Sequence, residues 1–277
     1  MHLSQALTRL HSSHEVEEEQ FEPGIAHEHQ AAEHRLHFWL SDVNVAAAYG
    51  ITPVLELQAS LPLRLAISEV NFIDSHHIIL LLIHYMVKYK GMKGKIVTAF
   101  SCSVKVEQMC KHYGLEQETV QIGFKHIAGK MITEDVLLGG EESGGIATKG
   151  HIPERDGIWM GLILFEFMAK SGKSLEDLIT EVYKIVGEFA FERIDLQIDN
   201  DTKLRIIKDC KAGKFTQFGK YTVERIETTD GFKFFFDADT WLMIRPSGTE
   251  PVLRTYAEAS TQEKVFDILA DAKATIL

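Results

Sequence analysis

The sequence predicts an α/β protein: a three-layer α/β/α sandwich domain followed by a smaller α+β domain with a mainly antiparallel sheet. From Ala66 onward, short apolar segments typical of strands alternate with segments of helical pattern, which favours parallel strand pairing beneath covering helices. Near residue 190 this alternation ends, and closely spaced strand-like segments follow one another up to a terminal helix. A chain of 277 residues is long enough for two domains with hydrophobic cores.

The larger expected domain spans residues 74–189. Asp74 and Ser75 are favoured helix-capping residues before an apolar stretch that stops at Gly91. The pattern Ser174-Leu-Glu-Asp177 is a capping box that opens a helix ending near residue 187. The other elements expected in this domain are strands at 95–100, 120–123 and 135–138 and helices at 78–89, 104–113 and 157–170.

The smaller expected domain spans residues 190–277. Consecutive strands joined by short turns predict antiparallel pairing. The pattern Ser260-Thr-Gln-Glu263 predicts a capping box at the start of the last helix. The other elements expected here are strands at 193–198, 220–225, 232–236, 241–244 and 254–259 and a helix at 201–211.

Composition excludes several classes of partner. With a net charge of -11 and a pI of about 5.6, the chain has no electrostatic basis for nonspecific binding to nucleic acid or to an anionic membrane. Cys102, Cys110 and Cys210 are odd in number and lack CxxC spacing, which argues against a disulfide framework or a thiolate zinc site. The longest apolar run, Ile78–Ile83, is too short to span a bilayer, and the N-terminus lacks a secretory pattern. We therefore expect a cytoplasmic location.

The segment Arg-Pro-Ser-Gly-Thr-Glu-Pro, which starts at Arg245, lies between two expected strands and carries the strongest chemical signal. A phosphate dianion is bound by hydroxyl groups, closely approaching backbone N–H groups and a bidentate guanidinium. Ser247 and Thr249 provide hydroxyls, and Gly248 allows close approach. Arg245 and Arg254 provide the charge. The alternative interpretation is a polar β-turn in which the glycine supplies the required backbone angles.

A second polar loop, Gly139–Gly145, directly follows an expected parallel strand. The carboxyl ends of such strands are where open α/β sheets bind ligands. Two carboxylates and a hydroxyl on a glycine-rich loop suit the neighbouring hydroxyls of a sugar, although many solvated turns have the same composition. The loop is therefore a candidate sugar site.

These segments together resemble the α-D-phosphohexomutase family of bacterial phosphoglucomutases and phosphomannomutases. The Arg245 segment is similar to the phosphate-binding loop of that family's C-terminal domain, and the Gly139–Gly145 loop is similar to its sugar-binding Gly-Glu-x-Ser-Gly loop. The segment Gly-Phe-Lys-His-Ile, from Gly123, resembles a family segment that places Lys125 near the substrate. The resemblance extends from residue 64 to residue 277 in the family's order.

The resemblance implies domains III and IV of that family, with hexose phosphates as ligands. It implies an isomerase that interconverts hexose 1-phosphate and hexose 6-phosphate. It places the ring hydroxyls on Glu141 and Ser143, with Gly140 and Lys125 beside them. The phosphate-binding group that it implies consists of Arg245, Ser247, Gly248, Thr249 and Arg254.

Two details of the resemblance concern the substrate and the next helix. Phosphoglucosamine mutases usually carry Gln and His at the positions of Glu142 and Gly145, so this chain favours glucose or mannose phosphates. A relative of the phosphoglucosamine mutases is the alternative. The stretch His151–Gly157 resembles the family segment after the sugar loop, in which Asp156 caps the following helix.

Two parts of the family's active site have no counterpart in the sequence. No segment resembles its Thr-Ala-Ser-His-Asn loop, so we expect no catalytic phosphoserine. The family holds Mg²⁺ on an Asp-x-Asp-x-Asp-Arg loop, but here Leu61, Pro62 and Leu63 precede Arg64, and such side chains cannot coordinate the ion. We therefore expect no metal bound by this chain, no turnover by it alone, and an upstream N-terminal half as a partner.

Residues 1–63 do not match the family, and residues 64–73 resemble the end of its domain II. Seven of the 13 histidines lie between His2 and His37, where periodicity is weak. The resemblance starts inside a functional loop, whereas domain boundaries normally fall in linkers. We hypothesise that residues 1–63 are read from a shifted frame or belong to a divergent gene start. The nucleotide sequence tests this, because one insertion or deletion near codon 63 should restore the aspartates.

Two further functions stay open at this point. One is a noncatalytic sugar-phosphate-binding protein that uses the same two loops. The other is a zinc or nickel site on His27, His29, His34 and His37, of which the last two would lie one turn apart on a helix. Clustered histidines without cysteines or acidic neighbours are more often a solvated tail. A gene for an upstream partner and equilibrium metal dialysis are the respective tests.

Overall fold

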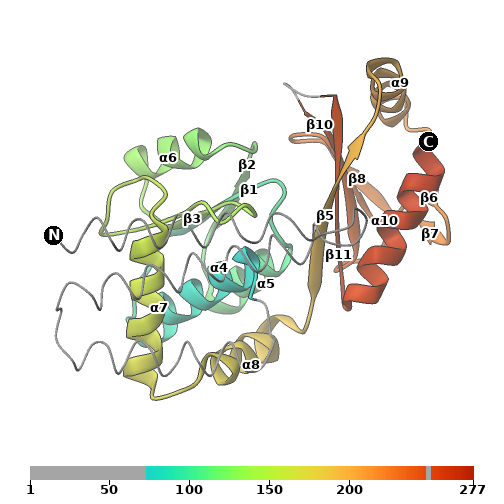
Figure 1. Ribbon diagram of the computed structural model, residues 1–277. Helices are drawn as coiled ribbons and strands as arrows, with labels where there is room; N and C mark the ends of the chain where they lie inside the picture. Colours follow the sequence, from blue (N-terminus) through green and yellow to red (C-terminus); the bar gives the residue numbers. More distant parts are fainter. Residues whose placement is uncertain (1–72, 248–250) are drawn as a thin grey trace, which may run out of the picture. The chain divides into compact units, whose positions relative to one another are not determined.

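The computed structural model describes residues 73–247 and 251–277, and the predictions for residues 1–63 and 64–72 lie outside this part (Figure 1). Residues 72–277 form one compact unit by their internal contacts. Within the described residues, a mixed four-stranded sheet with helices precedes an antiparallel five-stranded sheet and a two-stranded hairpin. This confirms the predicted fold class.

The first sheet has the strand order β2-β1-β3-β4. β1 (Lys95–Ala99) runs parallel to β2 (Gln117–Val120) and to β3 (Val136–Gly140). The sequence pattern does not predict β4 (Ile146–Thr148), which turns back antiparallel to β3. The strand expected at 120–123 is wrong in position and lies earlier, because the chain already enters a helix after residue 123.

Helices cover both faces of this sheet (Figure 1). α6 (Phe124–Thr133) packs on one face through Phe124 and Ile127. On the other face, α4 continues into a π-helical turn and packs beside α5. α7 and α8 pack on these helices. The elements on this face are α4 (Ser75–His84), η1 (Tyr85–Tyr89), α5 (Lys105–Tyr113), α7 (Gly157–Ser171) and α8 (Leu175–Val186).

The predicted helix starts are confirmed where a side chain supplies the cap. Asp74 and Asp156 each accept a hydrogen bond from a backbone N–H in the first turn of α4 and α7. Ser174 and Asp177 form the reciprocal capping box at the start of α8. The sequence pattern does not predict α6, because its N-cap residue Gly123 offers no side-chain oxygen.

The second sheet has the order β5-β11-β10-β9-β8, and every neighbouring pair is antiparallel. β6 and β7 form the separate hairpin. The strand expected at 220–225 is therefore wrong, since this stretch is divided between the hairpin and the sheet. The strands are β5 (Ala190–Gln197), β6 (Gln217–Phe218), β7 (Tyr221–Thr222), β8 (Arg225–Glu227), β9 (Phe232–Phe235), β10 (Trp241–Pro246) and β11 (Val252–Ala259).

Two helices belong to this second part, α9 (Asn200–Lys211) and α10 (Gln262–Ile276). The expected capping box at Ser260 is wrong. Thr261 is the N-cap of α10, and its side chain accepts a hydrogen bond from the N–H of Lys264. The helix therefore begins one residue later than the pattern suggested.

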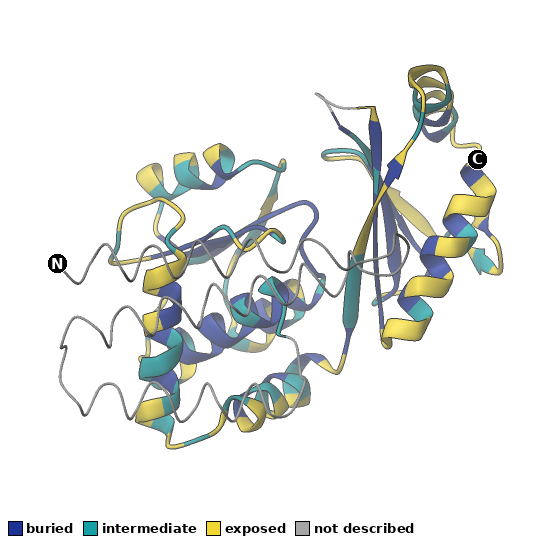
Figure 2. Cartoon of the chain, viewed as in Figure 1, coloured by how far each residue is buried: buried dark blue, intermediate teal, exposed yellow. Residues whose placement is uncertain are grey.

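The three central strands of the second sheet, β9, β10 and β11, are largely buried on both faces (Figure 2). One face packs on α9 and α10 through a core that includes Leu242 and Ile244. The opposite face forms an aromatic cluster whose buried members are Phe100, Phe235, Trp241, Met243 and Tyr256. Phe100 directly follows β1, so this cluster joins the two sheets. Because residues along a strand alternate between faces, the run Trp-Leu-Met-Ile of β10 is apolar throughout.

A buried lysine connects the two sheets at the aromatic cluster. Lys233 Nζ donates hydrogen bonds to the backbone carbonyls of Phe100 and Cys102, both at 3.1 Å, and lies 3.8 Å from the centre of the Trp241 ring. Burial lowers the pKa of Lys233 to about 8, and burial raises the pKa of nearby Glu258 to about 7. The opposite charge of each residue reduces the shift of the other.

We predict that the unfolding free energy of Glu258→Gln, minus that of the wild type, increases as the pH rises from 4.5 to about 7. Folding raises the pKa of Glu258 from 4.5 to about 7, so the wild type loses stability in this window as the unfolded chain releases its proton first. The expected change in unfolding free energy is on the order of 1–3 kcal/mol. Urea unfolding across this pH range measures it.

The control for this prediction is Glu263→Gln, on the exposed first turn of α10. Because this side chain is exposed, the substitution should change the unfolding free energy by less than about 0.5 kcal/mol. A pH-independent difference for Glu258→Gln would contradict the raised pKa.

Candidate functional site

The predicted sugar loop forms a closed turn between β3 and β4. The N–H of Glu141 donates to the carbonyl of Gly145 at 2.9 Å, and the N–H of Gly144 donates to the carbonyl of Glu141 at 3.1 Å. Gly144 has a φ of 90°, in the region that favours glycine. Ser143 is exposed in this turn, whereas Gly140 is buried at the end of β3.

The two acidic side chains of the loop are held by neighbouring elements. Glu141 is buried, and its carboxylate accepts a hydrogen bond from the N–H of Gly123 at 3.0 Å. Burial raises the pKa of Glu141, the hydrogen bond from Gly123 opposes this rise, and the charge of Glu142 adds to it. Glu142 accepts a hydrogen bond from Ser101, which follows β1. The first sheet and the start of α6 thus fix the loop from two directions.

Lys125 lies in the first turn of α6, two residues after the glycine that binds Glu141. Its side chain is exposed, and within the described residues it makes no hydrogen bond or ion pair. The positive end of the helix dipole lies at the same turn. Lys125 therefore lies close to Gly123, the residue that binds the sugar loop. A contact between Lys125 and a ligand stays a prediction.

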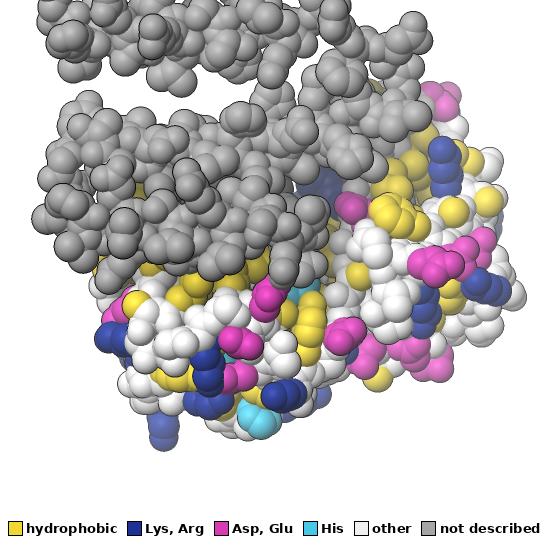
Figure 3. Space-filling model, turned by 60° about the horizontal axis from the view of Figure 1, so that its bottom comes forward, with side chains coloured by type: hydrophobic (Ala, Val, Ile, Leu, Met, Phe, Trp, Pro, Cys, Tyr) yellow, Lys and Arg dark blue, Asp and Glu magenta, His cyan; other side chains and the backbone are white. Residues whose placement is uncertain are grey.

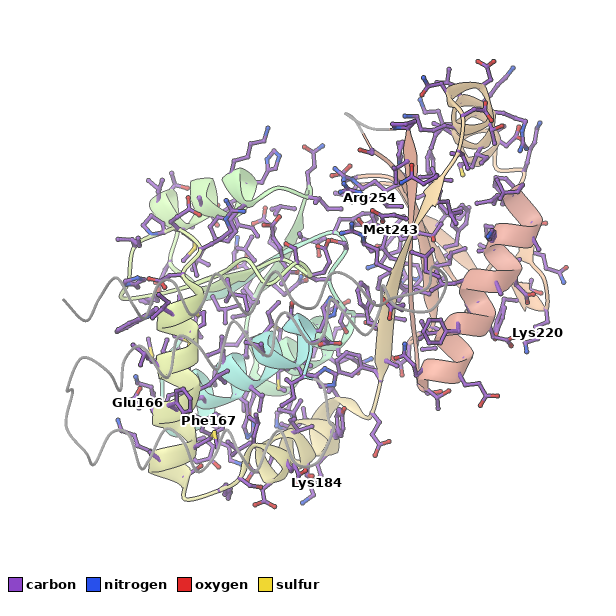
Figure 4. All side chains as sticks on the ribbon, viewed as in Figure 1. Glu166, Phe167, Lys184, Lys220, Met243 and Arg254 are labelled. Atoms are coloured by element: carbon purple, nitrogen blue, oxygen red, sulfur yellow. The ribbon has the colours of Figure 1, made fainter. Side chains whose placement is uncertain are left out.

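Two arginines lie opposite each other at the end of the β10–β11 pair. Arg245 and Arg254 are direct partners in the antiparallel register, so their side chains leave the same face of the sheet as Met243. Arg254 and Met243 are labelled in Figure 4. β5 places Asp195 opposite Arg254, with 3.8 Å between Arg254 Nε and Asp195 Oδ2. Like charges directly opposite each other destabilise a sheet. This arrangement therefore needs compensating negative charge.

Asp230 supplies compensating charge to Arg245 and connects two parts of the site. Its carboxylate accepts hydrogen bonds from Arg245 Nε at 3.1 Å and from Arg245 Nη2 at 3.3 Å. The same carboxylate accepts a hydrogen bond from the N–H of Ile122 at 2.9 Å. The next N–H, that of Gly123, binds Glu141. Two adjacent backbone N–H groups therefore connect the arginine pair with the sugar loop.

Ser247 lies at the start of the predicted phosphate loop and is buried. Its N–H donates a hydrogen bond to the carbonyl of Val252 at 3.0 Å, which closes the loop at the end of the β10–β11 hairpin. Gly248 and Thr249 lie outside the described residues, so their roles in phosphate binding stay predictions.

Sequence reasoning missed two residues of this region, Asp230 and Arg155. Asp230 belongs to an Asp-Gly turn, a common turn signal that does not reveal the contact with Arg245. Arg155 lies against the sugar loop, because a Cβ built on Gly145 would come within 2.6 Å of Arg155 Cδ. The Arg155 guanidinium also lies 5.5 Å from the centre of the Phe124 ring. Its position in the family-like segment after the sugar loop is the signal that could have found it.

Three further properties of the described residues concern surface charge, metal-ligating side chains and membrane-spanning helices. Acidic and basic side chains are interspersed on the face that Figure 3 shows. In residues 73–247 and 251–277, no three His, Cys, Asp or Glu side chains are grouped so that they could hold a metal ion. In the same part of the chain, no helix is both long and apolar enough to cross a membrane.

Comparison with known proteins decides the family. The family model described as phosphoglucomutase/phosphomannomutase, alpha/beta/alpha domain III, matches residues 74–186, and the model for the C-terminal domain of the same family matches residues 201–274. The chain belongs to the phosphoglucomutase/phosphomannomutase family. This confirms the resemblance that the motifs indicated. The members of this family are phosphohexomutases.

Individual phosphohexomutases agree with this assignment. The chain is 31% identical over 176 residues to a phosphoglucomutase/phosphomannomutase of Thermococcus kodakarensis, covering 64% of this chain and 36% of the relative. It is 30% identical over 207 residues to a phosphoglucosamine mutase of Latilactobacillus sakei, covering 73% and 41%. A crystal structure from Thermus thermophilus, described as a candidate phosphomannomutase, has a TM-score of 0.61 at 28% identity, covering 73% and 40%. The chain thus spans less than half the length of these proteins.

We predict that Gly231→Ala destabilises the protein by more than about 1 kcal/mol. Gly231 has a φ of 103°, and an added Cβ would lie 2.8 Å from the carbonyl oxygen of Ile244 and 3.2 Å from Arg245 Cβ. The substitution therefore strains the turn that carries Asp230 to Arg245. Urea unfolding measures the loss.

Gly129→Ala is the matched control, because Gly129 lies within α6 and an added Cβ meets no atom within 4 Å. This substitution should stabilise the protein by about 0.5–1 kcal/mol through higher helix propensity. Equal effects of the two substitutions would contradict the close approach at Arg245.

Proposed function

We propose that this chain is the substrate-binding half of a phosphohexomutase that interconverts hexose 1-phosphate and hexose 6-phosphate. The observation that carries the proposal is the pair Arg245 and Arg254, opposed on neighbouring strands beside Ser247. The proposal includes the division of the chain at residues 189 and 190 into a sugar-binding domain and a phosphate-binding domain.

The phosphate is proposed to bind at Arg245, Ser247, Gly248, Thr249 and Arg254. Opposed guanidinium groups repel each other, and Asp230 and Asp195 place negative charge near Arg245 and Arg254 respectively. A phosphate dianion between them would add charge-assisted, partly bidentate hydrogen bonds. Family membership supports this reading, because the motif lies in the region matched as the family's C-terminal domain.

The sugar hydroxyls are proposed to bind at Glu141 and Ser143, with Gly140 and Lys125 beside them. A buried carboxylate that receives only part of its hydrogen bonding from Gly123 can accept further hydrogen bonds from hydroxyl groups. The connection through Asp230, Ile122 and Gly123 supports one ligand that touches both loops.

The proposed sugars are glucose and mannose rather than glucosamine. The relatives include phosphoglucosamine mutases, so the family alone does not decide this point. At Gly145, an added Cβ would lie 2.6 Å from Arg155 Cδ and 3.0 Å from Glu141 Oε2. The histidine expected at this position in phosphoglucosamine mutases therefore does not fit while Arg155 keeps its place. The glucose or mannose reading is supported by the sequence, which has Glu142 and Gly145 where phosphoglucosamine mutases usually carry Gln and His.

Catalysis is proposed to need the parts of the family that lie upstream of this region. Phosphoryl transfer depends on a positioned donor and on charge stabilisation. Mg²⁺, when bound, neutralises negative charge on the phosphoryl oxygens. The residues of this chain would bind the substrate and orient it. A noncatalytic sugar-phosphate-binding protein is the second candidate, favoured by Leu61, Pro62 and Leu63 at the position of the metal-binding aspartates.

We predict that Arg245→Ala weakens glucose 6-phosphate binding to this chain by about 1.5–3 kcal/mol, or one to two decades in affinity. The reason is the loss of a charge-assisted contact to the phosphate. Isothermal titration of the full chain measures it. Glu141→Gln should cost less affinity, because it weakens one hydroxyl contact and leaves the phosphate contacts in place.

Arg205→Ala, which removes a guanidinium from α9 in the same part of the chain, is the control and should bind like the wild type. Free phosphate should compete with glucose 6-phosphate, and unphosphorylated glucose should bind far more weakly. Equal binding of glucose and glucose 6-phosphate would refute the phosphate site.

We also predict that this chain alone shows no mutase turnover with glucose 1-phosphate and Mg²⁺, because no segment resembles the family's phosphoserine loop. A coupled assay that detects glucose 6-phosphate measures it. Turnover that EDTA abolishes would mean that a phosphoryl donor and a metal site exist elsewhere in the chain.

A further inference from the structure

A pocket of about 380 Å³ lies where α4, α5 and α8 pack on one another. We call it the α8 pocket. Its volume falls within the range of small-molecule sites, about 300–1,000 Å³. No residue that lines it belongs to the sugar loop or to the predicted phosphate loop. Its polar lining consists of His84, Lys88, His112, Tyr113, Glu181 and Lys184.

A hydrogen-bond chain forms part of this lining. His84 is 1% exposed, and its Nε2 lies 3.0 Å from Glu181 Oε2 while its Nδ1 lies 2.6 Å from Tyr113 Oη. Because a carboxylate only accepts, Nε2 carries the proton and Nδ1 accepts from the hydroxyl of Tyr113. Burial lowers the pKa of His84, and the hydrogen bond to Glu181 opposes this shift. The imidazole is therefore neutral at pH 7, and the lysines provide the positive charge of the pocket.

These lysines outnumber the acidic side chain that they face. Lys88 Nζ donates to Glu181 Oε2 at 2.7 Å, and Lys173 donates to the other oxygen of the same carboxylate. Lys184, one turn after Glu181 on α8, makes no hydrogen bond or ion pair within residues 73–247 and 251–277. Three ammonium groups thus surround one carboxylate, in a chain with a net charge of -11. The local excess of positive charge favours an anionic ligand.

The backbone departs from regular α-helical geometry at this pocket. In η1, the N–H of Lys90 donates to the carbonyl of Tyr85, five residues earlier, at 3.1 Å. Turns of this kind are rare and frequently occur at functional sites. Two consecutive residues of this turn, Lys88 and Tyr89, both reach the carboxylate of Glu181, at 2.7 and 3.2 Å. The unusual turn therefore belongs to the structure that lines the pocket.

The remaining lining of the α8 pocket is apolar and aromatic. Ile185 contributes from α8, and the end of α5 contributes the rings of His112 and Tyr113. These two rings meet edge to face, with 4.8 Å between their centres. Ring faces and edges of this kind pack well against flat ligands. The lining thus combines ammonium groups with a surface for a flat, apolar body.

The geometry points to a second ligand site in the α8 pocket, which takes a small organic phosphate with a flat, apolar body. The phosphate lies between Lys88 and Lys184, since an ammonium is a compact charge that binds phosphate. Lys88 has three N–H donors, and Glu181 accepts one of them. The body of the ligand packs on Ile185 and Tyr113. The inference does not depend on the proposed function, because the two sites share no residue.

The test titrates phenyl phosphate into the full chain by calorimetry. All titrations use the Arg245→Ala background, which weakens binding at the predicted phosphate loop. Adding Lys184→Glu should weaken phenyl phosphate binding at least fivefold, because it places a carboxylate beside the phosphate. Lys208→Glu is the matched control, since Lys184 and Lys208 are both exposed in the last turn of a helix. The control should bind like the background chain.

Three results overturn the inference. The first is no detectable binding of phenyl phosphate by the background chain, and the second is equal binding by the Lys184→Glu and Lys208→Glu chains. The third is inorganic phosphate binding as tightly as phenyl phosphate, because the flat body would then contribute nothing. Circular dichroism shows whether each variant is folded. If Lys184→Glu does not fold, Lys184→Ala replaces it, and unchanged binding by that folded chain overturns the inference.

Discussion

The contact between the two sheets depends on the hydrogen bonds that Lys233 donates to the carbonyls of Phe100 and Cys102. These bonds fix the second sheet against the loop that follows β1, inside an aromatic cluster that excludes water. In the same arrangement, Asp230 of the second sheet's β8–β9 turn accepts a hydrogen bond from the N–H of Ile122. A buried ammonium is costly, and its lowered pKa reflects that cost. The two carbonyls, the Trp241 ring and the opposite charge of Glu258 offset part of this cost.

The arginine pair of the second sheet also depends on nearby groups of opposite charge. Arg245 and Arg254 face each other across two strands, an arrangement that a sheet tolerates only with negative charge nearby. Asp230 accepts two hydrogen bonds from Arg245, and Asp195, which Arg193 also binds, lies 3.8 Å from Arg254. In a chain with a net charge of -11, anion binding would require a local basic pair of this kind.

The sequence predicted those features of the fold that depend on residues close together in the chain. Side-chain caps such as Asp74, Asp156 and Ser174 fix helix starts within one turn, and the residues themselves reveal them. α6 was missed because its cap is a glycine, and β4 because a hairpin partner depends on a neighbouring strand rather than on its own residues. The two ligand loops were recognised from family motifs, and their ligand roles stay predictions. Asp230 was invisible, because its partners are distant in sequence and meet it only in the folded chain.

The pairing of β5 with β11 determines when the second sheet can fold during synthesis of the chain. β5 opens the second sheet, yet its sheet partner is β11, the last strand of the chain. During synthesis, β5 therefore leaves the ribosome long before the strand that completes its hydrogen bonds. The sheet can close only after translation has almost finished, which makes its folding slow and exposes β5 to wrong partners meanwhile. A ribosome that stops before β11 would release a chain whose arginine pair and second sheet cannot form.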